Sequence, residues 1–583
     1  MMVVLSSCTS DQLMESDLNS NETGEQKDSQ FFISLNITVP GGDDTRSTTN
    51  SDGGSGDIVV PSLNEKIMDS ARIYFCTKDA DDKYTIIASC ETSSDGGPFN
   101  KPNYTLGPSL LANSTHRLEI EVDINDLKNI IGKQIYILMV GNTDQTRELL
   151  SGWKTATKDV DKDPAEAKFS SWSPLTSYVS DYNGSLTDKS NGRIMPLVSA
   201  DPFSVTFGSP LASNASDADV IDAIKSLFNE KSTNGYGYVY HCDGILQLER
   251  ALARLDFKYT QVEGADVNTD YSYPVGKTNF QVRLDRLVLV NLNTQSYLFR
   301  HTIEGTRESA FGVTGKTPKL LGVENGFDTG DKYNWIYGSD WSYGTGATKG
   351  TTDLRNLLTW EVIDETEGIK KLVPTSSFDP NVNITLSNLY AHHPAYDTDA
   401  YRPWAYIYEN TIPMGSMMTD ENIYKYATGI MFKFVLLANP DESNSNKRPD
   451  LTFEMIGTDQ CPANITKSSE EGAAATTITI TNSDSQWVDV EYVDGKYELT
   501  YFAWIIHNEV DPVTITENNQ GVSNTYSVPG PMAYGVVRNN VYQTTISSIK
   551  DIPNPREPRS MFLEITVNIA PWNDRWDEEA TLY

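Results

Sequence analysis

The sequence predicts an all-β protein built as two antiparallel β-sandwich domains with a few short helices. Short segments of alternating hydrophobicity recur along the chain between turn signals, which is typical of sandwiches. The composition agrees, because the chain has 30 tyrosines and abundant Thr, Ser, Asn and Gly. At 583 residues the chain exceeds one ordinary domain, and two sandwiches with sizeable cores account for its length.

The first eight residues, MMVVLSSC, resemble the end of a bacterial lipoprotein signal. Small residues stand at the two positions before Cys8, as in the lipobox at which such a signal is cut and its cysteine is acylated. A complete signal has a basic start and ~7 to 15 apolar residues, so residues 1–8 are interpreted as a truncated signal. We expect lipidation at Cys8; the alternative is a chance cysteine at the start of a cytosolic chain.

Residues 9–30 are expected to form a flexible tether. They contain six acidic residues and one lysine, with almost nothing apolar, a composition that cannot offset the entropy of ordering. No later run approaches the ~18 apolar residues that a membrane span requires. We therefore expect any membrane attachment to come through Cys8.

A leading strand follows the tether, in the segment FISLNITV at residues 32–39. Its polar residues Ser34, Asn36 and Thr38 alternate with four apolar ones, the period-2 pattern of a half-buried strand. The apolar positions are Ile33, Leu35, Ile37 and Val39. Residues 41–57 are so rich in Gly, Asp, Ser and Thr that we expect an exposed loop, and this loop contains Arg46, the first arginine of the chain.

Residues 47–247 are predicted to form the first sandwich. Strands are expected at 71–75, 118–124 and 134–140, and an amphipathic helix at 217–230. The apolar stripe of that helix is interpreted as core packing; it comprises Val220, Ile221, Ile224, Leu227 and Phe228. Cys76 and Cys90 flank a hairpin turn at 79–82, which leaves a disulfide and two free buried thiols both open. The pairing of Cys242 and Cys461 is open as well.

Residues 248–583 are predicted to form the second sandwich. It begins at ERALARLDFKY, where Ala251, Ala253, Leu255 and Phe257 fall on one side of a strand and charged residues on the other. Further strands are expected at 280–290, 500–506, 536–549 and 562–569.

The composition and motifs argue against nucleic-acid binding and catalysis. A formal net charge of −34, from 46 basic and 80 acidic residues, would repel nucleic-acid phosphates. Neither zinc-ligand spacing nor a nucleophile with a base partner is apparent, so no metal, cofactor or catalytic residue is assigned. Asp159, Asp161 and Asp163 imitate the start of a calcium loop, but Pro164 replaces its turn glycine.

Five landmarks along the chain resemble the fimbrillins, the subunits of type V pili of Gram-negative anaerobes, and are closest to the major subunit of the short fimbriae. The most specific landmark is VVRNNVYQTTISSIK at residues 536–550, preceded by YFAWIIHN. The others are the lipobox, FFISLNITVPGGDDTR ending at Arg46, ERALARLDF at 249–257, and APWNDRW at 570–576.

The resemblance implies two transthyretin-like Greek-key domains and a subunit that polymerises by strand exchange. It implies a precursor anchored to the outer membrane, cut after an arginine by a trypsin-like protease, and then part of an extracellular fimbria that supports adhesion and biofilm. The matching cleavage position is Arg46, before Ser47, so residues 9–46 would be a propeptide. Implied partners are other copies of the chain, accessory fimbrial subunits, the protease, and host or bacterial surface ligands.

Exchange of the leading strand also follows from physical reasoning. Four large apolar side chains at roughly 1.5 to 3 kcal/mol each represent on the order of 6 to 12 kcal/mol, comparable to the stability of a whole domain. A groove vacated by this strand would bind another strand of the same period. The C-terminal segment supplies a candidate donor strand with Leu563, Ile565, Val567 and Ile569, and with Trp572 and Trp576 as further anchors.

Other interpretations remain open. The C-terminal strand could simply complete its own domain. The chain could be a tip or anchor accessory subunit, although the cleavage position at Arg46 and the alternating strand near the C-terminus favour a subunit of the fimbrial shaft. A surface glycan-binding lipoprotein is a further alternative, because 10 tryptophans and 30 tyrosines could stack on sugars.

Overall fold

The structure is a computed structural model of the full chain. It describes the following residues: 2–5, 30–38, 71–91, 115–142, 160–169, 195–231, 237–259, 272–275, 281–290, 292, 296–305, 319–320, 333–336, 360–365, 369–374, 383–385, 401–410, 427–437, 477–481, 487–493, 496–507, 513–519, 522–528, 534–550 and 563–571. Cys8, Val39, Arg46, Ser47, Cys461, Trp572 and Trp576 lie outside these residues, as do Asp159 and the whole linker at 41–57.

The predicted all-β class is confirmed. Among the described residues the helices are α2 (Ile124–Ile130), α5 (Asp217–Leu227) and a 3-10 turn (Pro164–Glu166), and the remaining regular elements are strands. Three of the described strand pairs are parallel, namely β1 with β5, β2 with β11, and β12 with β29. The division into sandwiches at residue 247 stays a prediction.

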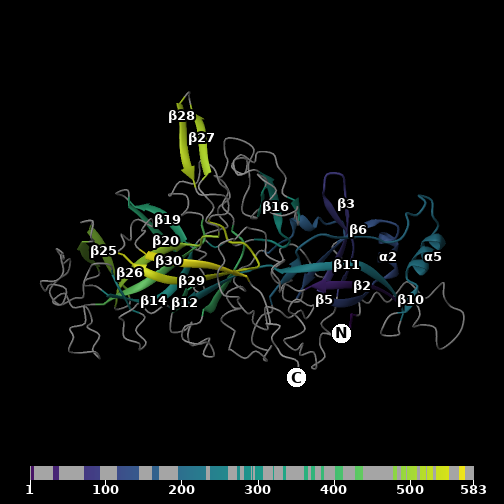
Figure 1. Cartoon of the computed structure of the whole chain (residues 1–583), viewed down its shortest axis with the longest axis horizontal. Helices are drawn as coiled ribbons and strands as arrows, with labels where there is room; N and C mark the ends of the chain where they lie inside the picture. The colour runs from purple at the N-terminus through teal and green to yellow at the C-terminus, as the bar shows by residue number, and fades with distance from the viewer. Residues whose placement is uncertain are drawn as a thin grey trace, which may run out of the picture.

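The first sheet has the order β1-β5-β2-β11-β8-β6-β3-β4, with β9 and β10 pairing beside it. It occupies one end of the molecule (Figure 1). Its strands are β1 (Met2–Leu5), β2 (Phe31–Thr38), β3 (Ala71–Lys78), β4 (Tyr84–Glu91), β5 (Thr115–Glu121), β6 (Gln134–Gly141), β8 (Leu197–Ser199), β9 (Phe203–Thr206), β10 (Glu230–Lys231) and β11 (Tyr238–Arg250).

The other strands surround a second core toward the opposite end (Figure 1). One sheet has the order β22-β12-β29-β30 and another β13-β14-β23-β26-β25-β24. These strands are β12 (Ala253–Lys258), β13 (Ser272–Pro274), β14 (Gln281–Val290), β22 (Arg402–Ile407), β23 (Gly429–Leu437), β24 (Thr477–Thr481), β25 (Trp487–Val493), β26 (Lys496–Trp504), β29 (Asn540–Ile549) and β30 (Leu563–Pro571).

Shorter strands complete the description. They are β7 (Lys168–Phe169), β15 (Ser296–Tyr297), β16 (His301–Gly305), β17 (Lys319–Leu320), β18 (Tyr333–Ile336), β19 (Trp360–Glu365), β20 (Ile369–Pro374), β21 (Asn383–Thr385), β27 (Val513–Asn519) and β28 (Val522–Val528).

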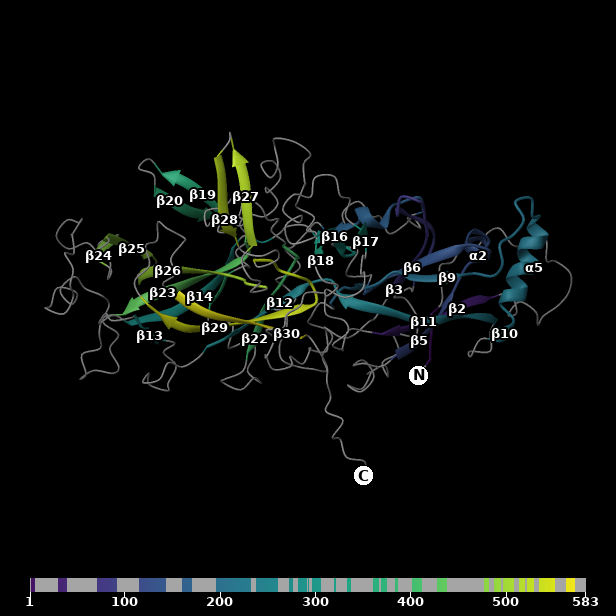
Figure 2. The same ribbon diagram turned by 45° about the horizontal axis from the view of Figure 1, so that its top comes forward.

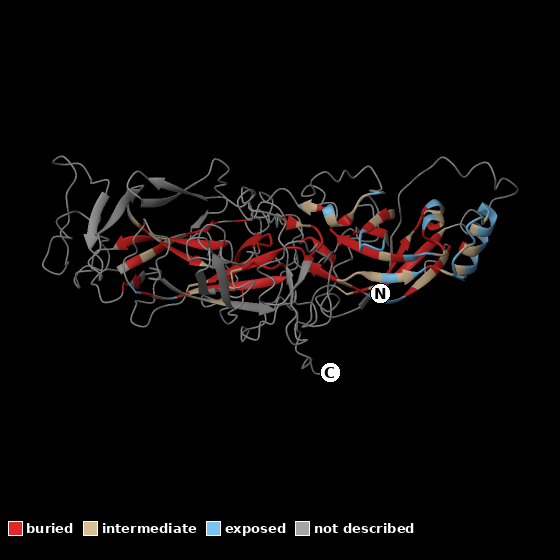
Figure 3. Ribbon diagram, turned by 90° about the horizontal axis from the view of Figure 1, so that it is seen from above, coloured by how far each residue is buried: buried red, intermediate tan, exposed pale blue. Residues whose placement is uncertain are grey.

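The buried residues form two hydrophobic clusters (Figure 3). The first draws mainly on residues from Phe31 to Leu252 and adds a few from later in the chain, namely Leu298, Phe299, Leu320, Tyr406, Tyr408 and Val541. The second begins at Ala253. Helix α5 contributes to the first cluster as predicted, because Ile224 and Phe228 are buried. Its start is fixed by a capping box of Ser216 and Asp219. The helix lies at the tip of the first sheet (Figure 2).

Two details differ from the sequence-based expectation. The charged side of ERALARLDF is not exposed, because Arg254 and Asp256 are 3% and 1% exposed and form a bidentate ion pair at 2.7 and 2.8 Å. The strand predicted to reach residue 124 ends at Glu121, since the Asp123 side chain accepts a hydrogen bond from Asn125 N and begins α2.

The cysteines of the first hairpin are free thiols. Cys76 pairs in register with Ile86, whereas Cys90 pairs with Ile73, so the two cysteines do not face each other across the hairpin. Cys76, Cys90 and Cys242 are buried and free, and burial raises the pKa of the Cys76 thiol. The open choice between a disulfide and two thiols is thus resolved for Cys76 and Cys90.

Within the described residues no helix has the length and apolar character needed to cross a membrane. The same residues contain no group of three or more His, Cys, Asp or Glu side chains that could hold a metal ion.

Candidate functional site

Strand β2 lies inside the first sheet, between β5 and β11 (Figure 1). It pairs antiparallel with β5, from Phe32 opposite Glu121 to Thr38 opposite Thr115. It pairs parallel with β11, from Phe31 opposite Tyr238 to Thr38 opposite Gln247. Removing β2 would leave backbone donors and acceptors unpaired on both neighbours. We call the space that β2 occupies the β2 groove.

One face of β2 packs into the first core. Ile33, Leu35 and Ile37 are at most 2% exposed, as the alternation predicts. The face also includes Phe31, whose ring meets that of Phe228 edge-on with centroids 5.4 Å apart. Side chains of this size contribute roughly 1.5 to 3 kcal/mol each, so the loss of β2 would uncover an apolar surface comparable in free energy to the stability of a domain.

The opposite face of β2 is covered by an arginine that the sequence analysis did not single out. The Nε of Arg117, on β5, donates to Ser34 Oγ at 2.7 Å. Its Nη2 reaches over β2 to the ring nitrogens of His241 on β11, with 2.6 Å to Nε2, and His241 in turn lies 3.2 Å from Glu230. We call these four residues the Arg117 clasp. Phe32 and Ser34 are each 2% exposed, whereas Asn36 and Thr38 are partly exposed, so only the second half of this face has the exposure that the pattern of a half-buried strand predicted.

Beside the clasp, β11 carries a bulge. The register jumps from Ser34 opposite His241 to Asn36 opposite Ile245, so that residues 242–244 face a single residue of β2. Gly244 has φ +109°, and a Cβ there would lie 2.8 Å from the Phe203 ring. The Asn36 side-chain amide donates to Gly244 O at 3.3 Å. Cys242, also in the bulge, is no reactive thiol, because burial raises its pKa to about 12.

A second glycine marks the entrance of the groove. Tyr238 N donates to Gln30 O at 2.9 Å, and Gly237 lies so close that a Cβ would be 2.3 Å from the same oxygen. Gly237 also has φ +112°, so any other residue would be strained there. A glycine beside a strand is the one signal that could have indicated these two positions from the sequence.

The predicted donor segment forms β30 at the edge of the β22-β12-β29-β30 sheet. It pairs only with β29 among the described strands, from Leu563 opposite Ile549 to Pro571 opposite Asn540. Ile565 and Val567 are partly buried against the second core. The structure does not bring β30 to β2, because the two strands belong to different sheets.

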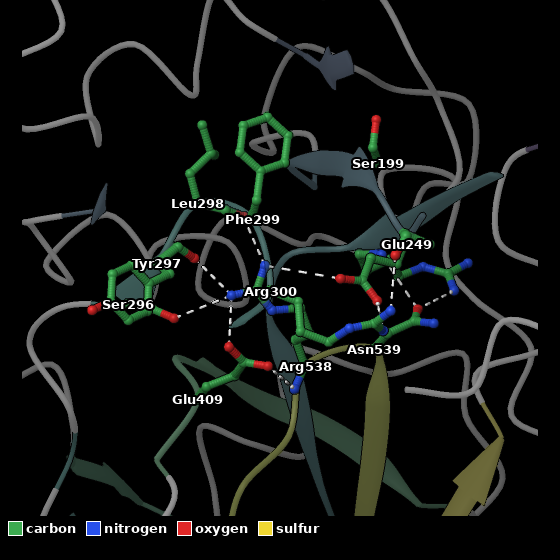
Figure 4. A network of polar contacts seen from close by, with 12 residues as sticks. Ser199, Glu249, Ser296, Tyr297, Leu298, Phe299, Arg300, Glu409, Arg538 and Asn539 are labelled. Carbon is green, nitrogen blue, oxygen red and sulfur yellow. Dashed lines mark hydrogen bonds and ion pairs between the residues drawn. The ribbon is translucent and has the colours of Figure 1, made fainter. Parts of the chain in front are cut away.

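A buried polar network lies where the two clusters meet (Figure 4). Arg300 Nη1 donates to Glu249 Oε2 at 2.8 Å, and Arg538 Nη2 donates to Glu409 Oε2 at 2.6 Å. Arg538 also donates to the carbonyl oxygens of Leu298 and Tyr297 at 2.7 and 2.6 Å. Two landmarks of the sequence therefore meet here: ERALARLDF supplies Glu249 and VVRNN supplies Arg538.

Burial governs the ionisation of this junction network. Glu249 is fully buried, and the loss of hydration raises its pKa to about 7 despite the nearby guanidinium groups of Arg300 and Arg538. Burial disfavours charge on Arg538 as well, but Glu409 outweighs it and holds the pKa of Arg538 above its ordinary value. Both segments were recognised in the sequence, but the burial of their charged side chains in one network was not predicted.

The described residues of the second half include two buried histidines, His301 and His507. Burial lowers the pKa of both His301 and His507 to about 3, so both are neutral near pH 7. His507 Nδ1 lies 2.7 Å from the Tyr542 hydroxyl, and the same hydroxyl accepts from Val537 N at 2.8 Å. These contacts hold the VVRNN segment against β29.

Comparisons with known proteins give remote structural matches. No protein-family model matches the chain, and no curated protein sequence matches it. A candidate cell adhesion protein from Parabacteroides distasonis is 12% identical with a TM-score of 0.33, covering 93% of this chain and 99% of its own. A candidate cell adhesion protein from Bacteroides eggerthii is 10% identical with a TM-score of 0.28, covering 94% of this chain and 97% of its own. The tip fimbrial protein Mfa3 from Porphyromonas gingivalis, with a C-terminal truncation, is 9% identical with a TM-score of 0.26, covering 93% of this chain and 100% of its own. We base the functional proposal on the β2 groove itself, because overlaps at this level do not carry an assignment.

Proposed function

We propose that the chain is a structural subunit of a cell-surface fimbria whose subunits are joined by strand exchange. An Arg-specific, trypsin-like protease cuts between Arg46 and Ser47, the segment that contains β2 leaves, and β30 of a neighbouring subunit enters the β2 groove. The observation that carries this proposal is the position of β2. The strand that precedes the first arginine of the chain is paired on both edges and packed into the first core.

The free energy of the open groove supports the proposal. After cleavage, β2 is held only by noncovalent contacts, and its departure uncovers pockets that an alternating strand can fill. The donor is an edge strand with a single paired neighbour among the described strands, so it gives up one ladder and gains two. Each subunit would then both accept and donate a strand, and such a head-to-tail contact does not close, so it makes a filament.

The remaining features define where the subunit would act. In this proposal the precursor is held at the outer membrane by a lipid on Cys8 and joins an extracellular fimbria that supports adhesion and biofilm. Its partners are further copies of the chain, accessory fimbrial subunits, the protease, and ligands on host or bacterial surfaces. A tip or anchor role is the alternative within the same assembly.

A glycan-binding lipoprotein is less well supported. It rested on the number of aromatic residues, yet many of those described lie in the two cores. Tyr74, Tyr273, Tyr408, Tyr501 and Tyr542 are among the largest fully buried side chains of the described residues, and Trp404 is 5% exposed. Such residues cannot stack on a sugar.

The test is Arg-specific proteolysis of the purified full chain, followed by N-terminal sequencing and electron microscopy. We expect a new N-terminus at Ser47 together with filaments. The Arg46→Gln variant should not be cut at this position and should remain monomeric. If the chain is cut at Arg46 and still remains monomeric over the concentration range in which the wild-type precursor is soluble, the proposed function is wrong.

A further inference from the structure

The two strands of the proposed exchange carry closely matching sequences. Residues 33–38 of β2 read ISLNIT, and residues 565–570 of β30 read ITVNIA. Three positions are identical, and two others replace Ser by Thr and Leu by Val. The match includes the polar positions, which an apolar alternation alone does not require.

We infer that β30 of one subunit fills the β2 groove of the next in a single register, specified by two polar side chains. The inference rests on the proposed function. Thr566 takes the place of Ser34, and Asn568 takes the place of Asn36. The apolar positions then follow, with Leu563, Ile565, Val567 and Ile569 in the places of Phe31, Ile33, Leu35 and Ile37.

The groove presents a partner for each polar side chain. Arg117 Nε donates to the hydroxyl of Ser34, and a threonine at this position offers the same acceptor. The bulge carbonyl of Gly244 accepts from the amide of Asn36, and the asparagine of the donor offers the same N–H. Two such contacts, one to β5 and one to β11 from positions two residues apart, are both reproduced with the same chemistry in this register.

In its own subunit β30 stands in different surroundings. Thr566 is opposite Thr545 and Asn568 is opposite Gln543 in the ladder with β29. Neither neighbour resembles Arg117 or the bulge of β11. The side chains of Thr566 and Asn568 thus match the contacts offered by the β2 groove of another copy more closely than their neighbours on β29 in the same subunit.

One position does not match, and it makes the register testable. Glu564 takes the place of Phe32, which is 2% exposed and opposite Glu121. Two carboxylates directly opposite each other repel. In the competing register, slipped by two residues, Glu564 takes the place of Ser34 and lies beside Arg117, but it is then opposite Glu119, which is fully buried. The inferred register places the donor carboxylate opposite the less buried Glu121 instead.

The two registers predict different effects of Glu564→Gln. In the inferred register the substitution removes a repulsion and tightens binding several-fold. In the slipped register it removes an ion pair with Arg117 together with the repulsion by Glu119, so binding does not tighten. The experiment uses synthetic peptides of residues 563–571, added to the full chain after Arg-specific cleavage, with affinity measured by fluorescence anisotropy. A peptide of β28, residues 522–528, is the strand control.

Three further substitutions complete the test. Thr566→Val and Asn568→Leu keep the shape of each side chain and remove its polar contact, so we expect affinity losses of roughly tenfold and of a few-fold respectively. On a chain carrying Arg117→Met, Thr566→Val has no further effect. Should that chain fail to fold, the Glu564→Gln, Thr566→Val and Asn568→Leu peptides still decide the question on the unaltered groove.

The outcomes separate the register from the function. If the cleaved chain binds neither the wild-type peptide nor any variant, or binds it no better than the β28 control, strand exchange itself is wrong and the register fails with it. If the wild-type peptide binds specifically while Thr566→Val and Asn568→Leu bind equally well, or Glu564→Gln binds no more tightly than the wild type, the register is wrong and strand exchange stands.

Discussion

Charged side chains at the meeting point of the two clusters are buried with their counter-charges. Arg538 and Glu249 are each 0% exposed, and Glu409 is 1% exposed. Buried ion pairs add little net stability over apolar replacements, but loss of one partner leaves an uncompensated charge. The junction network should therefore tolerate single changes poorly.

Arg538→Met is expected to destabilise the chain by roughly 3 to 5 kcal/mol, because Glu409 loses the guanidinium that neutralises it. The midpoint of urea unfolding of the full chain measures the effect. Lys128→Met is the control, since its contact with Asp217 at 3.8 Å lies at the surface and should contribute about 0 to 1 kcal/mol. Equal shifts for the two variants would contradict a buried network.

The raised pKa of Glu249 predicts a pH dependence of stability. The folded chain holds a proton on Glu249 up to about pH 7, whereas the unfolded chain releases it near the ordinary glutamate pKa of 4.5. The folded state thus binds more protons between these values, so this contribution to stability is complete below about pH 4.5 and is lost as pH rises to about 7. The loss amounts to about 3 kcal/mol in total.

Urea midpoints of the wild-type chain and of Glu249→Gln, compared at several values from pH 4.5 to 8, test this dependence. The wild type should lose stability relative to the variant across this interval, because glutamine does not titrate. Parallel pH profiles for the two chains would show that Glu249 does not titrate in that window.

At the scale of single elements, local periodicity predicted what depends on local sequence. Strand β2 and helix α5 each bury apolar side chains that the sequence pattern placed on one side, and the predicted turn at 79–82 joins β3 to β4. The second face of β2 is more buried than a half-buried strand predicts at Phe32 and Ser34, and at Ser34 the covering Arg117 comes from another strand. The burial of Arg254 and Asp256 was missed for the same reason: the covering layer is distant in the sequence.

Gly237→Ala is expected to weaken the binding of β2 in its groove, because a Cβ there would lie 2.3 Å from Gln30 O. After Arg-specific cleavage, the fragment that contains β2 should dissociate faster from this variant than from the wild type. The matched control is Gly208→Ala. Gly208 has φ +76°, but a Cβ there would meet no atom closer than 3.7 Å. The Gly208→Ala substitution therefore introduces backbone strain without a steric clash. Equal dissociation rates for both variants would mean that the close approach to Gln30 does not hold β2.

The candidate site as a whole was only partly predictable. The leading strand, the arginine after it and the alternating C-terminal strand are visible in the sequence. The Arg117 clasp and the bulge of β11 are not, because they depend on the sheet order in which β5 and β11 flank β2. Nothing in the local pattern of residues 115–121 distinguishes an arginine that crosses a neighbouring strand from one that points to solvent.

At the scale of the whole molecule, the β2 groove and strand β30 pack against different hydrophobic clusters. A chain that ends at residue 562 lacks β30 but keeps β2 and its neighbours. In the proposed exchange this chain can accept a strand and cannot donate one. It should therefore shorten filaments when it is mixed with the full chain during cleavage.

Filament length distributions from electron microscopy measure this effect, with a circular dichroism spectrum as the check on folding. A chain that ends at residue 571 is the control, because it keeps β30 and should polymerise. Polymerisation of the shorter chain on its own would show that the donor lies elsewhere.

Strand β11 pairs with β2 in parallel over seven residue pairs, from Tyr238 to Gln247. Any strand that replaced β2 in the same direction would form a ladder of this kind, with bonds that run across the strands. Tension applied along the strand would then load all of these bonds together instead of opening them one at a time. Such a joint would resist stretching far better than peeling, a mechanical property suited to an attachment exposed to flow.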